Sequence, residues 1–147
     1  MNLFKVLDIS GSALLAERQR AEVVASNMAN AESTHTAEGG PYKRMHVVFG
    51  AHPMQKSGFA MTLASFNDMN AEGVRVERVV QDGAPPVRRF EPGHPDADAD
   101  GYVSYPAINP VEEMVNLMGS ARAYQLNASA VQSTKNMIQA SIDIIKS

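Results

Sequence analysis

The clearest hydrophobic pattern lies in the last quarter of the chain. Apolar residues recur there in alternating steps of three and four, with Lys135 as the charged member of the series: Met114, Leu117, Ala121, Tyr124, Ala128, Val131, Lys135, Ile138, Ile142 and Ile145. A 3.5-residue period sustained over several heptads predicts one long helix with a coiled-coil seam. No proline interrupts residues 111–146, so we expect a helix of roughly 55 Å at 1.5 Å per residue.

The start of this helix has its own signals. Asn109 is a good N-cap residue, Pro110 suits the first helical position, and Glu112 stands where a capping box places its acidic residue. The sequence therefore predicts a helix that begins at Pro110.

The first part of the chain repeats the pattern more weakly. One heptad face comprises Leu3, Leu7, Ser10, Leu14, Glu17, Ala21, Val24 and Met28, and a second face beside it comprises Val6, Ile9, Ala13, Ala16 and Val23. Two faces predict a helix with more than one neighbour. Gly11 weakens the expectation of an unbroken helix, and the polar cluster over residues 27–40 ends it.

The middle of the chain changes to glycine, proline, valine and aromatic residues. Short β-branched or aromatic runs bounded by turn residues predict strands, and they cover residues 42–49, 74–80, 87–90 and 102–105. We expect one small sheet with a long loop over residues 50–73. The predicted fold is α+β and mainly α: a helix in residues 1–34, a β-rich insertion in 35–109 and a long helix in 110–147, the helices packed as a coiled-coil-like pair.

Composition narrows the function. The net charge is −3 and basic residues occur at most in pairs, which argues against nucleic acid as a partner. The chain has no cysteine, which excludes a disulfide framework and a thiolate nucleophile. The sequence shows neither the pattern of a cleavable signal peptide nor an apolar run long enough to span a membrane. We therefore expect no direct membrane insertion.

Catalytic and metal motifs are weak. The chain has four histidines, and none is spaced as in a zinc-binding helix. His94 lies near three aspartates, but no nucleophile motif accompanies it. We therefore predict that the protein is not an enzyme and has no cofactor.

The stretch from His94 to Ala107 raises the possibility of a calcium loop. Asp96, Asp98, Asp100 and Gly101 match the opening of an EF-hand, in which alternate oxygens bind the ion. The twelfth position, which needs a bidentate glutamate, is Ala107. A calcium-responsive binding module centred on the three aspartates is thus the alternative, and a solvated turn is the simpler interpretation.

Three stretches resemble a known family. The first is RAEVVASNMANAEST, which contains Asn27 and Asn30, the second is GPYKRMHVVF, and the third is EPGHPDADADGYVSYPAINPVEEMVNLMGSARAYQLNA. Together they resemble bacterial flagellar basal-body rod proteins, and in particular proximal rod proteins of the FlgC type. The family signature falls on Asn27, Asn30, His94, Asp96, Asp98, Asp100 and Gly101.

The resemblance implies a structural role in motility. Proteins of this family leave the cell through the flagellar type III export apparatus without a cleaved signal peptide and form the rod within the periplasm. There they assemble helically with copies of themselves and other rod proteins and transmit torque. The apolar residues of the first N-terminal heptad face (Leu3, Leu7, Leu14, Ala21, Val24 and Met28) and the whole C-terminal series would then form the subunit interface, because two lone helices have little apolar surface to offset the entropy of ordering.

Lys135 leaves two readings open within this interface. Its aliphatic stem can lie along the apolar seam while the ammonium reaches water, or the ammonium can set the register by binding a partner's carboxylate.

Overall fold

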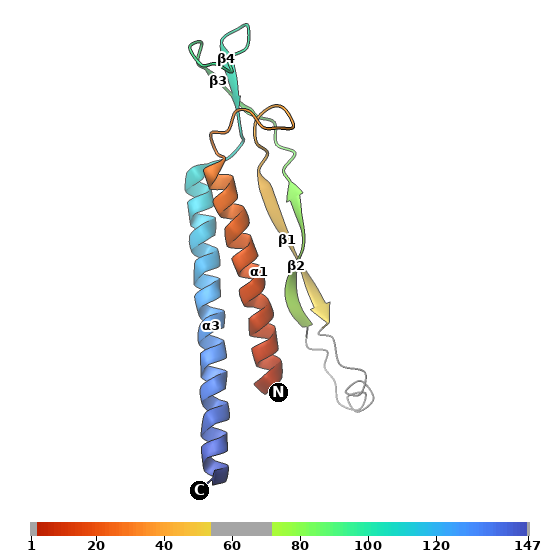
Figure 1. Ribbon diagram of the computed structural model, residues 1–147, viewed down its shortest axis with the longest axis vertical. Coiled ribbons are helices and arrows are strands. Elements are labelled where there is room, and N and C mark those ends of the chain that lie inside the picture. The colour runs from red at the N-terminus through yellow and green to blue at the C-terminus, as the bar shows by residue number, and fades with distance from the viewer. Residues whose placement is uncertain (1–2, 54–71, 147) are drawn as a thin grey trace. The chain divides into compact units, whose positions relative to one another are not determined.

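A computed structural model describes residues 3–53 and 72–146 of the chain. The elements follow the order α1 (Leu3–Ala29), β1 (Met45–Pro53), β2 (Glu72–Gln81), β3 (Val87–Phe90), β4 (Tyr102–Tyr105) and α3 (Pro110–Lys146). Figure 1 shows the two long terminal helices and the β insertion that separates them in the sequence. The predicted fold class is confirmed: the helices pack together and an antiparallel β insertion joins them.

Helix α1 continues through Gly11 without a break. A Cβ atom at this position would meet nothing within 4 Å, so the glycine is not required by close packing. The helix ends at Ala29, and Asn30 follows with its backbone N–H and its side-chain Nδ2 both donating to the Ser26 carbonyl, at 3.1 and 2.9 Å. Asn30 also accepts a bond from Ser33 Oγ at 3.1 Å, which turns the chain away from the helix axis.

Helix α3 begins where the sequence predicts. The Oδ1 atom of Asn109 accepts a hydrogen bond from the Val111 N–H at 3.0 Å, as expected of an N-cap residue. The structure differs from the sequence prediction in the role of Glu112, which was expected to complete a capping box. Glu112 accepts a bond from Arg44 at 3.1 Å instead, because the arginine offers a charged donor beside the helix start.

In the part of the β insertion that the structure describes, the strands form two separate two-stranded sheets, not the single sheet that the sequence suggests. In one of them β1 pairs with β2, and in the other β3 pairs with β4 in antiparallel register, with Val87 opposite Tyr105 and Phe90 opposite Tyr102. Both β3 and β4 have the predicted bounds. The predicted loop over residues 50–73 contributes its ends to β1 and β2, and its remainder, 54–71, lies outside the described residues.

The chain divides into two compact units. The helix-end unit contains described residues 3–19, 49–53, 72–77 and 121–146, and the junction unit contains residues 20–48 and 78–120. The division of the sequence into 1–34, 35–109 and 110–147 is a different one and stays a prediction.

Each unit buries polar and small residues between its helical segments. The buried helix residues of the junction unit are Val24 and Asn27 of α1 with Glu113 and Ser120 of α3, and those of the helix-end unit are Ser10 and Ala16 of α1 with Thr134 of α3. The hydroxyl groups of Ser120 and Thr134 donate to carbonyls of their own helix at 2.9 Å. These side chains are therefore satisfied locally, and their small size permits close helix packing.

The buried row of α3 differs from the predicted apolar seam by about one position. Glu113, Ser120, Asn127 and Thr134 recur every seven residues and are buried or half-buried, while the next row, Met114, Ala121, Ala128, Lys135 and Ile142, is exposed. Leu117, Val131 and Ile138 lie between the two rows and are half-buried, and Tyr124 and Ile145 are exposed. On α1 the predicted face is better covered, since Leu3, Leu7, Leu14, Ala21 and Met28 are half-buried and Val24 is buried.

Candidate functional site

The junction unit contains a buried polar cluster centred on Asn27. This side chain is 1% exposed and uses all four hydrogen-bonding positions of its amide. The Nδ2 group donates to the Met45 carbonyl at 2.8 Å and to Glu113 Oε2 at 3.0 Å. The Oδ1 atom accepts from the Met45 N–H at 2.9 Å and from the Tyr42 hydroxyl at 3.2 Å. The amide thus pairs with both backbone groups of Met45 as a neighbouring strand would.

Glu113 brings a negative charge into the same cluster. Its side chain is 1% exposed, and its carboxylate accepts bonds from Asn27, from Asn116 at 3.4 Å and from Arg44, with which it forms an ion pair. The Arg44 side chain is 16% exposed and also binds Glu112 at 3.1 Å. A buried ion pair needs such additional hydrogen bonds, because desolvation of both charges offsets much of their attraction.

The electrostatics of Arg44 follow from its two carboxylate partners. Burial alone would lower its pKa, but hydrogen bonds and charge interactions with Glu113 and Glu112 outweigh that effect and raise the pKa of Arg44 above its usual value. Arg44 therefore stays charged throughout the physiological range. Both glutamates also lie in the first turns of α3, where the helix dipole favours negative charge.

The cluster connects three segments that are distant in the sequence. Asn27 belongs to the end of α1, Tyr42 to Met45 lead into β1, and Glu112 to Asn116 open α3. Asn27 was expected to matter only through the family resemblance. The roles of Glu113, Arg44 and Tyr42 were not predicted, because a rule that assigns apolar residues to the packed face places charged residues outside it. The seven-residue recurrence of Glu113, Ser120, Asn127 and Thr134 is the signal that could have revealed the buried row.

The aspartate loop forms a second organised region of the junction unit. Asp98 Oδ1 accepts from the backbone N–H of Asp100 at 3.0 Å and of Tyr102 at 2.8 Å, and the Asp98 N–H donates to the Tyr102 carbonyl at 2.8 Å. Asp98 also pairs with Arg88. The bond from the Tyr102 N–H, with those from Asp100 and Arg88, lowers the pKa of Asp98. Any stabilisation from this group is therefore lost as the pH falls through that lowered pKa.

The other signature residues of this loop have separate partners. Asp96 accepts a bond from the Thr34 hydroxyl at 2.6 Å, which ties the loop to the segment after α1. His94 accepts from the Asp96 N–H through Nδ1 at 3.1 Å. Gly101 has a φ of +79°, in the left-handed region that favours glycine. Asp98 therefore acts as a turn residue, and Asp96 tethers the loop to the segment after α1.

The calcium interpretation gains no support from this arrangement. Within residues 3–53 and 72–146, no group of three or more acidic or histidine side chains is arranged to hold a metal ion. Asp98 directs one oxygen to backbone N–H groups and the other to Arg88, and Asp96 binds Thr34. The side chains of Asp96 and Asp98 are thus engaged with different partners.

Comparison with known proteins places these regions in a family. The model for flagella basal body rod protein matches residues 7–35, and the model for flagellar basal body rod FlgEFG protein C-terminal matches residues 99–144. Flagellar basal-body rod protein FlgC of Yersinia enterocolitica is 41% identical over 140 residues, which cover 94% of each chain. The chain belongs to the FlgC family.

Distant bacteria have similar FlgC proteins. The FlgC protein of Borreliella burgdorferi is 33% identical over 154 residues, with 99% of each chain covered. That of Bacillus subtilis is 35% identical over 150 residues, covering 99% of this chain and 100% of the relative. The protein is accordingly a structural, non-enzymatic subunit of the flagellar basal-body rod. Neither described helix combines the length and apolar content needed to cross a membrane.

The regions matched by the two family models include residues of the polar cluster. The two matched regions contain Asn27 and Glu113, which bind each other directly. Tyr42, Arg44 and Met45 lie between the matched regions and complete the cluster. In this FlgC-family chain, the matched end regions are therefore joined through a segment that neither family model covers.

We predict that Glu113→Gln destabilises the isolated protein far more than Glu112→Gln. Both glutamates bind the same Arg44 Nη2 atom, but Glu113 is 1% exposed and Glu112 is 57% exposed. Loss of the buried anion should cost about 3–5 kcal/mol, and loss of the exposed one less than about 1 kcal/mol. Urea unfolding followed by circular dichroism measures both. The double variant Arg44→Met/Glu113→Met should be less destabilised than the sum of its single changes, and equal costs for the two Gln variants would contradict the account.

We predict that Gly101→Val damages the aspartate loop more than Asp98→Asn. A Cβ atom at Gly101 would lie 3.0 Å from Phe90 Cε2 and 3.2 Å from Pro92 Cβ, and valine resists the positive φ, so a loss of about 1–3 kcal/mol is expected. Asparagine keeps the oxygen that accepts from Tyr102. Thermal unfolding of both variants provides the measurement, and a larger loss for Asp98→Asn would show that the ion pair with Arg88 outweighs the turn.

Proposed function

We propose that the protein is a proximal-rod subunit that packs against neighbouring rod subunits through the apolar residues that α3 leaves exposed. These neighbours are copies of itself and other rod proteins, arranged helically around the rod axis within the periplasm. The assembly transmits motor torque. The proposal includes delivery through the flagellar type III export apparatus, which the family resemblance implies.

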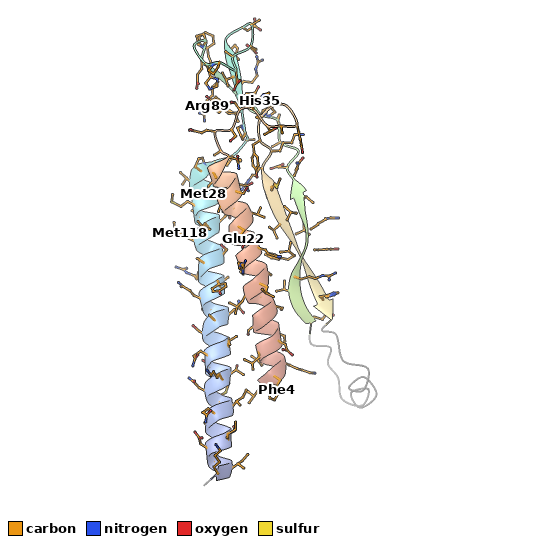
Figure 2. All side chains as sticks on the ribbon, in the orientation of Figure 1. Phe4, Glu22, Met28, His35, Arg89 and Met118 are labelled. Carbon is orange, nitrogen blue, oxygen red and sulfur yellow. The ribbon has the colours of Figure 1, made fainter. Side chains whose placement is uncertain are left out.

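The observation that carries the proposal is the amount of apolar surface on α3. The large exposed apolar side chains of this helix are Val111, Met114, Val115, Met118, Tyr124, Leu126, Met137, Ile142, Ile144 and Ile145. Met118, which projects from α3 in Figure 2, is 59% exposed, and Ile145 is 84% exposed. Exposed apolar surface on this scale is typical of a protein that associates with partners.

The spacing of these residues suggests helical neighbours. Val111, Met114, Val115 and Met118 follow the steps of three, four and seven that place side chains on one helix face. Such a face suits packing against another helix, as in a coiled coil. Because the buried row of α3 consists of polar residues, the exposed apolar residues stay available for contacts between subunits.

We predict that Met118→Asp and Ile142→Asp each abolish swimming without unfolding the isolated protein. The side chains are 59% and 41% exposed in the single chain, so a charge there should change its stability by no more than about 0.5 kcal/mol. In an assembled rod the same charge would be buried without a partner and prevent packing. Swimming in soft agar, export judged by immunoblot and thermal unfolding of purified protein provide the readouts.

Asn136→Asp is the matched control for these variants. Asn136 is exposed on the same helix and its Oδ1 accepts a bond from Gln132 at 3.0 Å, a role that an aspartate oxygen retains. The control strain should swim normally. Normal swimming of both the Met118→Asp and Ile142→Asp strains would mean that these rows are not assembly contacts.

A further inference from the structure

Strand β3 has a free edge within the junction unit. Within residues 3–53 and 72–146 its sheet contains only β3 and β4, so among these residues one side of β3 lacks a neighbouring strand. All four of its residues are exposed. One of these four exposed residues is Arg89, which is labelled in Figure 2. Strand edges of this kind can accept an extended segment from another chain through backbone hydrogen bonds.

The register identifies the backbone groups at this edge. The Glu91 N–H donates to the Gly101 carbonyl at 2.9 Å, one step beyond the pairing of Phe90 with Tyr102. In an antiparallel pair, hydrogen-bonded and non-hydrogen-bonded pairs alternate. The N–H and C=O groups of Arg88 and Phe90 therefore point away from β4 and form the free edge.

The side chains along this edge follow an apolar–basic–basic–apolar order. Val87 and Phe90 are 47% and 64% exposed. The Arg88 guanidinium lies 4.8 Å from the centre of the Tyr102 ring, and that of Arg89 lies 4.6 Å from the centre of the Tyr105 ring. Arg88 has Asp98 as a partner, whereas among the ion pairs of the described residues none involves Arg89. Because successive side chains of a strand point to opposite faces, the strand offers one arginine over an aromatic ring on each face.

We propose that the free edge of β3 binds an extended acidic segment of another protein by strand addition. A complementary segment has the order apolar–acidic–acidic–apolar, since each acidic side chain would then lie opposite an arginine and each apolar one opposite Val87 or Phe90. The order reads the same in both directions, so it suits either strand orientation. This site is independent of the rod packing proposed for α3.

A second copy of the chain is a poor occupant of this edge. Two antiparallel β3 strands aligned along their full length would place Arg88 of one opposite Arg89 of the other, and like charges in such positions repel. The chain's one pair of adjacent acidic residues is Glu112 and Glu113. They lie in α3 with Glu113 buried, so they cannot serve as a strand. The partner is therefore a different protein.

In the test, the full-length protein is titrated with the peptide Thr-Val-Glu-Glu-Val-Thr, whose two ends are blocked. NMR spectra of the protein amides record binding. We expect saturable shifts of the Arg88 and Phe90 amide signals and slower hydrogen exchange at both. Two control peptides separate strand addition from simple charge attraction. One has methylated backbone nitrogens at its four central residues and the other replaces glutamate with lysine, and neither should produce the shifts.

Charge reversal completes the test. Arg88→Glu/Arg89→Glu should weaken binding of the acidic peptide about tenfold, which corresponds to about 1.4 kcal/mol, and should bind the lysine peptide instead. Arg75→Glu/Arg78→Glu alters two exposed arginines of β2 and should leave binding unchanged. The proposal would be overturned by the absence of saturable shifts at Arg88 and Phe90, by equal binding of the methylated peptide, or by undiminished binding of the acidic peptide to the charge-reversed protein.

Discussion

The four hydrogen bonds of the Asn27 amide are the contact on which the junction unit depends. An amide buried in this way is costly unless every donor and acceptor has a partner. Here the partners come from the segment that leads into β1 and from the start of α3. One side chain thus fixes the chain positions at which the helices meet the β insertion. Glu113 extends the same network to Arg44 and makes it sensitive to the loss of a single charge.

The buried row of α3 is made of polar side chains, and many of the large apolar side chains of this helix lie on its surface. The α3 residues that face α1 are small or polar, and the serine and threonine hydroxyls among them bond to carbonyls of the same helix. Larger apolar side chains further from this row, among them Met114, Met118 and Ile142, stay exposed. This distribution is unfavourable for a protein that acts alone and favourable for a subunit whose core is completed by its neighbours.

Much of the fold could be predicted from local patterns. The start of α3 followed from Asn109 and Pro110, and β3 and β4 followed from short β-branched and aromatic runs, because caps and turns are determined by nearby residues. The separation into two sheets could not be read in this way, since strand pairing depends on contacts distant in the sequence. The buried polar cluster around Asn27 was not predicted for the same reason. Nothing local to Arg44 indicates a buried carboxylate at Glu113, and an apolar heptad rule assigns α3 a packed face one position from the observed row.

The aspartate loop illustrates how identical residue types take different roles. Asp98 closes a turn on Tyr102, whereas Asp96 reaches Thr34 in the segment after α1. The alternation of aspartates suggested a common ligand, but the backbone directs their side chains to separate partners. A motif of acidic residues therefore indicates a metal site only when the chain brings the oxygens together.

Hydrogen exchange at the Met45 amide in the isolated full-length protein tests the central claim most directly. This N–H donates to the Asn27 side chain at 2.9 Å, so its exchange reports whether the cluster is closed before any neighbour binds. We predict that it exchanges as slowly as the most protected amides of α1. Exchange as fast as that of the exposed Gly83 amide would contradict the account, because it would mean that the cluster does not hold the single chain together.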